Sequence, residues 1–190
     1  MKPFIFYGGN KMRLFIGIPI GDAARAALLR ATGRMRQTAD GRYVDGDLYH
    51  ITLAFLGELD EGRLREIQSA MAAAAADVQP VMLTLSRAGY FGRPDNAILY
   101  ADVHGAQSLH PIADKLRRML DAYRLPYDRK PFKAHITLAR RVRASKELLG
   151  VAVEPIPFAA GRFTLFHSCR VAGRLCYLPI YEAPFEREDS

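Results

Sequence analysis

The chain has 190 residues, a length typical of one domain with a sizeable core. Its composition, 49% hydrophobic and 25% charged, is that of an ordinary globular protein, and no apolar run approaches the ~18 residues that a membrane helix needs. The formal net charge of +7 favours polyanionic partners such as RNA, DNA or phosphorylated metabolites, although an unspecialised basic surface would give the same balance.

Hydrophobic periodicity predicts the order β-α-β-α-β-β-α-β-β-β, which indicates an α+β fold with antiparallel sheets and helices on one face. Asp22 is expected to cap the first helix and Asp60 to begin the second. The predicted strands cover residues 13–19, 48–56, 81–86, 97–103 and 135–139, with a terminal hairpin of 158–171 and 174–181; the predicted helices cover 22–37, 60–76 and 108–123, and residues 89–96 and 143–157 are expected to be irregular.

The two ends of the chain are expected to lie outside the folded domain. Residues 1–11 precede Met12, where a clean strand pattern begins, and are predicted to be an N-terminal extension that could be disordered and dispensable. A single domain is expected over 12–184, followed by an acidic tail over 185–190. The start has no apolar core or cleavage site of a signal peptide, so we expect a cytoplasmic protein.

The chain has two cysteines, Cys169 and Cys176, which are too few for a disulfide framework or a zinc site. If Ala172-Gly173 forms a two-residue hairpin turn, the register places these cysteines opposite each other. We expect them to be reduced in a cytoplasmic protein.

One five-residue stretch occurs twice: His50-Ile51-Thr52-Leu53-Ala54 returns as His135-Ile136-Thr137-Leu138-Ala139, 85 positions later (135 minus 50). The two copies lie on either side of the chain's midpoint. This arrangement suggests two halves of one domain, each of which contributes one His and one Thr to a shared site.

In a strand, the side chains at positions i and i+2 share a face. His50 and Thr52 would therefore lie on one face, with Ile51, Leu53 and Phe55 on the other. A half-buried strand often presents polar residues to solvent, and a single copy would favour that interpretation. Two identical copies favour a site, because nothing in strand packing requires His twice at the same place.

Two histidines in one cleft can act as acid and base, because an imidazole titrates near pH 6.5. Each Thr hydroxyl can donate a hydrogen bond to an anionic oxygen. Together the four side chains fit a tetrahedral phosphate, and hydrolysis of a cyclic phosphodiester needs a base for water, an acid for the leaving oxygen and donors for the other oxygens. This chemistry requires no metal ion and no cofactor.

The duplicated His-Ile-Thr-Leu resembles the paired signature of the 2H phosphoesterase superfamily. Within it, the chain is similar to the RNA 2′,3′-cyclic phosphodiesterases, also called 2′-5′ RNA ligases. The resemblance covers about residues 12–184 and rests on Arg13-Leu14-Phe15, on residues 50–57, on residues 129–140 and on Ser168, Gly173 and Tyr177. It implies a bilobal fold of two pseudo-symmetric α+β lobes with a central cleft, and hydrolysis of a 2′,3′-cyclic phosphate to the 2′-phosphate. It also implies ATP-independent 2′-5′ joining of RNA ends.

The resemblance implies that His50 is the proton donor to the leaving 3′ oxygen and that His135 is the proton acceptor from water, although a pseudo-symmetric site permits either order. Thr52 and Thr137 would hold the phosphate, and Arg140 would contact the ligand. Strict alternation puts Arg140 on the face opposite His135, so either the strand twists or ends at Ala139, or Arg141 makes the contact instead. Tyr49 and Tyr100 replace the Leu and Trp expected from the family pattern.

The other histidines are expected to contribute less. His104 and His110 are predicted to lie on the surface, and His167 could line the cleft. Phe15 and Phe55 are expected in the core. No further ligand follows the His pair at metal spacing, and no motif supports a Ser or Cys nucleophile.

The expected partners are RNA ends or nucleoside 2′,3′-cyclic phosphates, with tRNA as one candidate, and the expected state is a monomer without an obligatory protein partner. Two alternatives stay open. The chain could be a non-catalytic RNA-binding module, or a 2H phosphodiesterase acting on ADP-ribose cyclic phosphate or on 2′-5′ oligonucleotides.

Overall fold

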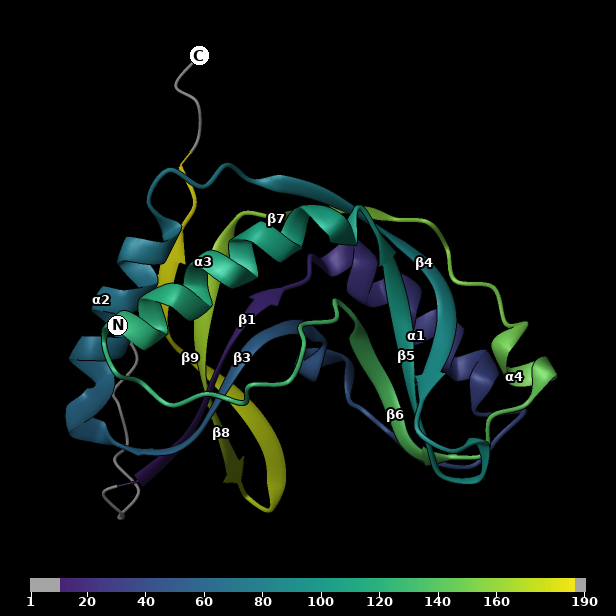
Figure 1. The fold of residues 1–190 in the computed structure, drawn as a ribbon. Helices are drawn as coiled ribbons and strands as arrows, with labels where there is room; N and C mark the ends of the chain where they lie inside the picture. The colour runs from purple at the N-terminus through teal and green to yellow at the C-terminus, as the bar shows by residue number, and fades with distance from the viewer. Residues whose placement is uncertain (1–10, 187–190) are drawn as a thin grey trace.

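The computed structural model describes residues 11–186. Figure 1 shows the elements along the chain. The strands are β1 (Lys11–Pro19), β2 (Arg42–Tyr43), β3 (His50–Asp60), β4 (Val81–Phe91), β5 (Ala97–His104), β6 (Ile136–Val142), β7 (Pro157–Ala160), β8 (Arg162–Val171) and β9 (Arg174–Pro184); the helices are α1 (Asp22–Met35), α2 (Leu64–Ala75), α3 (Leu109–Ala122) and the short α4 (Lys146–Leu149). The predicted α+β class is confirmed.

The described strands form one antiparallel sheet in the order β7-β4-β5-β6-β3-β1-β8-β9, with β2 beside β6. Strands β3 and β6, which contain the two copies of the repeat, are neighbours at the centre. They are paired through a single position, Ile51 with Ile136, directly after the two histidines. An antiparallel register centred there brings His50 toward Thr137 and Thr52 toward His135. The two halves of the sheet therefore meet at the repeated motif.

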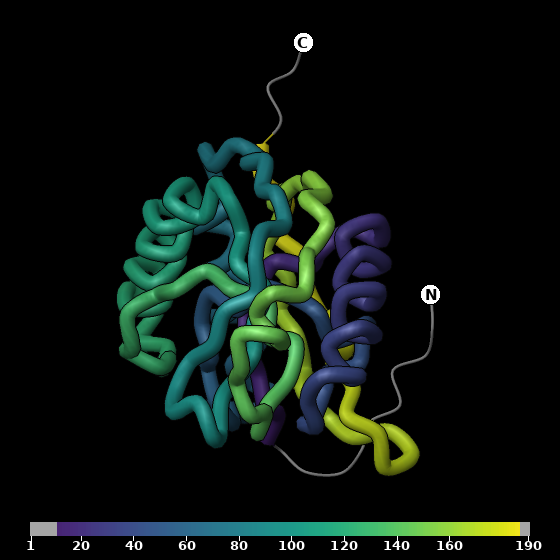
Figure 2. The backbone as a smooth tube through the Cα atoms, turned by 90° about the vertical axis from the view of Figure 1, so that its right-hand side faces the viewer, coloured from purple at the N-terminus to yellow at the C-terminus, as the bar shows by residue number. Residues whose placement is uncertain are grey.

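Helices cover both halves of the sheet on the side away from the repeated histidines. Helices α2 and α3 pack on each other and on β3, β8 and β9, whereas α1 contacts β7 (Figures 1 and 2). Helix α3 has the strongest amphipathic pattern: Leu109, Ile112, Leu116 and Leu120 are buried at helical spacing. In the sheet, Ile51 and Ile136 are fully buried in the same core.

Both repeat strands depart from regular pairing at equivalent points. Against β1, strand β3 has an extra residue at Leu53 and another at Leu56, the third and sixth positions after His50. Against β5, strand β6 has extra residues at Leu138 and Arg141, again the third and sixth positions after its histidine. Each extra residue is a β-bulge, which reverses the face on which the following side chains lie.

Several predicted boundaries were wrong. Asp22 is the first residue of α1 and pairs with Arg25, while Gly21 occupies the cap position. Strand β3 continues to Asp60, so the second helix begins only at Leu64. Strand β4 runs to Phe91 and includes part of the expected loop, because Gly89 and its neighbours pair with β5.

The end of the chain also differs from expectation. The first strand of the predicted hairpin is divided near Gly161: β7 pairs with β4, and β8 pairs with β1. Phe185, which was placed in the tail, is buried against Phe163. Lys11, placed in the extension, begins β1. The remainder of the predicted extension, residues 1–10, and residues 187–190 of the tail lie outside the described residues.

The predicted register of the β8–β9 hairpin is confirmed. Ala172 and Gly173 form the two-residue turn, both with positive φ (49° and 80°), as the tight turns of hairpins require. Cys169 and Cys176 are partners across the hairpin, and both thiols are free.

Candidate active site

A cleft of about 800 Å³ lies where the two halves of the sheet meet, and it is lined by all five residues of the predicted site: His50, Thr52, His135, Thr137 and Arg140. They come from β3 and β6 and from the residue immediately before β6, so the duplicated motif supplies both walls. The further lining residues are Arg13, Phe15, Arg42, Tyr43, Val44, Asp45, Leu48, Phe55, Asp128, Lys130, Ser168, Leu175 and Tyr177.

His50 is held by one hydrogen bond on each ring nitrogen. Its Nδ1 lies 2.7 Å from the carbonyl oxygen of Leu48, an acceptor, so Nδ1 carries a proton. Its Nε2 lies 2.8 Å from Oγ1 of Thr52, which donates when the ring is neutral. The same-face placement predicted for His50 and Thr52 is therefore confirmed, and the imidazole is fixed in one tautomer.

Aromatic rings surround His50. The ring centroid of Phe15 lies 4.7 Å from that of His50, Tyr177 lies edge-on at 5.3 Å, and Phe166 lies at 6.0 Å. This burial lowers the pKa of His50 to about 4, and the nearby positive charges of Arg140 and of His135 when protonated lower it further; the Leu48 carbonyl opposes the shift. His50 is therefore neutral near pH 7 in the free protein.

His135 has the same backbone anchor and a more open environment. Its Nδ1 lies 2.7 Å from the carbonyl oxygen of Lys133, which leaves Nε2 available to a ligand. Phe91 and Tyr100 contact the ring edge-on, with centroids at 4.9 and 5.8 Å. Burial lowers the pKa of His135, as do the charges of Lys133 and Arg140, whereas the Lys133 carbonyl and the carboxylate of Asp102 raise it.

The bulges settle the position of Arg140. Because Leu138 is an extra residue, Arg140 returns to the face of His135 and Thr137 and lines the cleft. Arg141, the alternative, is itself the second extra residue, with φ 55°. The same kind of bulge in β3 moves Phe55 onto the His50 face, so the prediction that Phe55 belongs to the core was wrong: it is half-buried and lines the cleft. Phe15 is buried, as predicted, and also lines the cleft.

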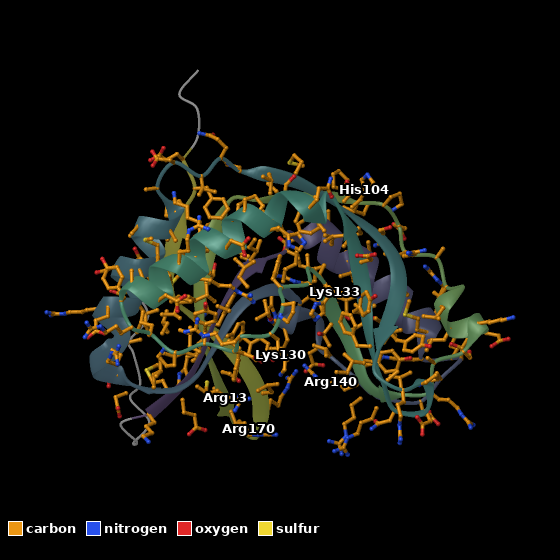
Figure 3. All side chains as sticks on the ribbon, viewed as in Figure 1. Arg13, His104, Lys130, Lys133, Arg140 and Arg170 are labelled. Carbon is orange, nitrogen blue, oxygen red and sulfur yellow. The ribbon has the colours of Figure 1, made fainter. Side chains whose placement is uncertain are left out.

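The cleft has more cations than anions. Arg13, Arg42, Lys130 and Arg140 line it together with Asp45 and Asp128. Figure 3 shows Arg13, Lys130 and Arg140 around the middle of the molecule. The guanidinium of Arg13 lies 4.8 Å from the ring centroid of Phe55, and Lys130 pairs with Asp128 at 2.9 Å. Such a surface attracts an anionic ligand.

Other residues fall where their surroundings dictate. Tyr49, before the first motif, is buried, and its hydroxyl lies 3.4 Å from Oγ1 of Thr32 in α1, so it faces the core. His104 and His110 are exposed at the end of β5 and on α3, as predicted. Sequence reasoning did not place Phe91 and Phe166 at the histidines; their strands are remote in sequence, and no local pattern marks them.

Within residues 11–186, no three His, Cys, Asp or Glu side chains gather into a group that could hold a metal ion. No helix in these residues is both long and apolar enough to cross a membrane.

The family model of the 2′-5′ RNA ligase superfamily matches residues 22–171. The chain belongs to this superfamily. An RNA 2′,3′-cyclic phosphodiesterase of Geobacillus stearothermophilus is 31% identical over 158 residues, which cover 82% of this chain and 50% of that relative, so the chain corresponds to about half of that protein. An RNA 2′,3′-cyclic phosphodiesterase of Thermotoga maritima is 25% identical, with coverage of 92% of this chain and 96% of the relative.

Two solved structures superpose on nearly the whole chain. The TT0787 protein of Thermus thermophilus superposes with a TM-score of 0.78 at 28% identity, over 94% of this chain and 100% of that one. Escherichia coli LigT complexed with 3′-AMP superposes with a TM-score of 0.76 at 26% identity, over 93% and 99% of the two chains. The 2H phosphoesterase fold expected from the duplicated motif is confirmed.

Proposed function

We propose that this protein is an RNA 2′,3′-cyclic phosphodiesterase that hydrolyses the cyclic phosphate of an RNA end or a nucleoside to the 2′-phosphomonoester. The pair of imidazoles carries the proposal: each has Nδ1 bound to a backbone carbonyl, both line one basic cleft, and each has a Thr two residues on. The curated relatives in the superfamily are named for this activity.

In the proposed reaction, a water molecule attacks phosphorus while one histidine takes its proton, and the bond between phosphorus and O3′ breaks while the other histidine protonates O3′. Thr52, Thr137 and Arg140 bind the non-bridging oxygens, whose negative charge grows in the transition state. The products are a free 3′-hydroxyl and a 2′-phosphomonoester. Acid, base and hydrogen-bond donors are all supplied by side chains, so we propose that the reaction needs neither a metal ion nor a cofactor.

We assign the proton donor to His50 and the proton acceptor to His135, following the family resemblance. In the free protein, burial makes His50 a poor proton carrier near pH 7. An anionic phosphodiester between the two rings raises the pKa of each, because it favours the charged imidazolium. The assignment therefore requires that His50 gain its proton when substrate binds.

The test of the reaction is hydrolysis of 2′,3′-cyclic AMP in excess chelator, with identification of the product isomer. We expect the wild type to release the 2′-phosphate, and His50→Ala and His135→Ala each to lose about 10²–10⁴-fold in kcat. Loss of activity with chelator would disprove metal independence. Failure of the wild type to turn over, with salt-dependent RNA binding retained, would favour the binding-module alternative.

The roles of the histidines need a substrate that does not require an acid. In a 2′,3′-cyclic phosphorothiolate, sulfur replaces the 3′ bridging oxygen, and a thiolate leaves without protonation. We expect His50→Ala to recover most of its activity on this substrate and His135→Ala to recover none. Recovery by His135→Ala alone would reverse the assignment.

We propose that the same site also supports RNA joining, in which the 5′-hydroxyl of a second RNA replaces water as the nucleophile. The basic histidine takes the proton of this hydroxyl, its oxygen bonds to phosphorus, and O3′ leaves with a proton from the acidic histidine, so a 2′-5′ linkage forms without ATP. We propose RNA ends, tRNA among them, as substrates, a monomer as the working form and the cytoplasm as its setting. The free Cys169 and Cys176, which face each other in β8 and β9, fit a reducing compartment.

A further inference from the structure

A second cavity of about 430 Å³ adjoins the cleft at the β8–β9 hairpin, and the proposed reaction does not use it. Arg13, Ser168 and Leu175 line both spaces, so the two meet along these residues. The volume lies in the range of ligand pockets, about 300–1,000 Å³. The other lining residues are Lys11, Glu58, His167, Cys169 and Arg170.

The second cavity is electropositive. Lys11, Arg13 and Arg170 contribute three positive charges against the single carboxylate of Glu58. None of these three cations belongs to an ion pair within residues 11–186. Arg170 is oriented by a hydrogen bond from Nη1 to the carbonyl oxygen of Gly173, 2.7 Å long, and Figure 3 shows it close to Arg13. Cations without carboxylate partners are available to a phosphate.

Neutral groups complete the second cavity. Leu175, where the two spaces meet, remains 41% exposed, which offers an apolar surface to a ribose or a base. Burial lowers the pKa of His167, so this ring is neutral near pH 7 and can exchange hydrogen bonds without adding charge. Both features suit a nucleotide rather than a bare anion.

The two carboxylates of the cleft lie outside the second cavity. Asp45 and Asp128 line the cleft alone. Asp128 pairs with Lys130, and Asp45 lies 3.6 Å from Arg174, so their charges offset the cations there. An RNA chain that leaves the cleft past Arg13 meets the positive charges of Arg170 and Lys11.

We propose that the second cavity binds the internucleotide phosphate on the 5′ side of the terminal nucleotide, together with part of the preceding nucleotide, so that the protein prefers oligonucleotide ends to free cyclic nucleotides. This inference rests on the proposed function. Arg13 lies at the boundary and serves both phosphates, while Lys11 and Arg170 are specific to the internal one.

The test compares three substrates: adenosine 2′,3′-cyclic phosphate, the dinucleotide ApA ending in a 2′,3′-cyclic phosphate, and the same dinucleotide with an uncharged methylphosphonate linkage. For the wild type we expect kcat/KM for the charged dinucleotide to exceed that for the mononucleotide about tenfold, the worth of one charge-assisted contact. The methylphosphonate dinucleotide should lose most of this advantage.

The variants are Lys11→Gln, Arg170→Gln and their combination. We expect the double variant to abolish the dinucleotide advantage and to leave the mononucleotide within about twofold of the wild type. Lys11→Gln alone makes the test independent of the turn that Arg170 supports. Arg65→Gln is the matched control, because it removes the same charge from the exposed face of α2, outside both cavities.

Salt dependence gives a second readout that a purely structural role would not change. Each phosphate bound from a single strand contributes about −0.7 to the slope of log affinity against log salt. For the wild type, this slope should be steeper by about 0.7 for the charged dinucleotide than for the mononucleotide. In the double variant, the two substrates should have the same slope. No turnover of the mononucleotide by the wild type would overturn the proposed function itself. Turnover of all three substrates with equal kcat/KM, or equal losses on every substrate in the double variant, would overturn this inference alone.

Discussion

The two halves of the site contain the same five residues and give their histidines different surroundings. His50 is enclosed by Phe15, Phe166 and Tyr177 and bonded through Nε2 to its own threonine. His135 has Phe91 and Tyr100 at its edge, and only its Nδ1 has a hydrogen-bond partner among the described residues. Identical motifs therefore reach different protonation behaviour, because the strands packed around them differ.

A difference between the neighbouring strands β1 and β5 explains much of the difference in burial between the two histidines. In the sheet register, Gly17 of β1 lies opposite Thr52, and Tyr100 of β5 lies opposite Thr137. A Cβ at Gly17 would lie 3.2 Å from Cδ2 of His50 and 2.8 Å from the carbonyl oxygen of Ile51. The glycine thus admits the His50 ring, whereas the other half places a tyrosine there. The burial of each histidine therefore depends on the residue that the neighbouring strand places beside it.

The largest expected consequence of this asymmetry is in pH-dependent stability. The pKa of His50 is about 4 in the folded protein against about 6.5 when unfolded, so the unfolded chain binds a proton between these pH values that the folded chain does not. The contribution is present above pH 6.5 and is lost as pH falls toward 4, by at most about 3 kcal/mol.

Urea unfolding near pH 7 and near pH 4 measures this difference. We expect His50→Gln to lose less unfolding free energy between the two pH values than the wild type, and His135→Gln to resemble the wild type more closely. Equal losses in the wild type and His50→Gln would show that the His50 environment does not lower its pKa.

The second prediction concerns Gly17→Ala, which tests whether the glycine causes the different burial of the two histidines. The added methyl group meets a backbone oxygen that cannot move freely, so we expect a loss of about 1–3 kcal/mol in unfolding free energy and a lower kcat through displacement of His50. Gly33→Ala is the control, because open space surrounds Gly33 in α1. Urea unfolding and hydrolysis of 2′,3′-cyclic AMP give the two readouts; wild-type values in both would exclude Gly17 as the cause of the asymmetry.

Substitution of the two threonines tests the difference between the halves of the site in a third way. Thr52→Val and Thr137→Val each remove a phosphate donor, for an expected loss of about tenfold in kcat/KM. Thr52→Val should cost more, because Oγ1 of Thr52 also orients His50. Steady-state kinetics on 2′,3′-cyclic AMP measures both losses. A larger loss of kcat/KM in Thr137→Val than in Thr52→Val would contradict the proposed difference.

The smallest expected effect is at Asp102. Its carboxylate raises the pKa of His135, so Asp102→Asn should lower that pKa slightly and leave His50 unchanged. The asparagine can keep the hydrogen bond that Oδ1 accepts from the amide of Val103, 3.0 Å long. An NMR titration of the imidazole protons measures both rings, and an equal shift at His50 would argue against a local effect.

Much of the site could be predicted from sequence because its information is local. The duplicated motif fixed which four side chains share a face, and the two-residue turn at Ala172-Gly173 fixed the pairing of Cys169 with Cys176. The packing of Phe166 and Tyr177 around His50 could not be found this way, because both lie more than 100 residues along the chain from His50. The bulges were also missed, since alternation assumes regular pairing and the extra residues depend on the partner strand.

The bulge at Leu138 has a consequence for comparing sequences. Because of this extra residue, Thr137 and Arg140 lie on the same face of β6 although they are three positions apart. A relative with one residue fewer at this point would keep an arginine beside its histidine in a flat strand, four positions on instead of five. An alignment gap at this position would thus indicate a regular strand that keeps its arginine in the cleft. The number of residues between the histidine and the arginine would not show by itself whether the two arginines are equivalent.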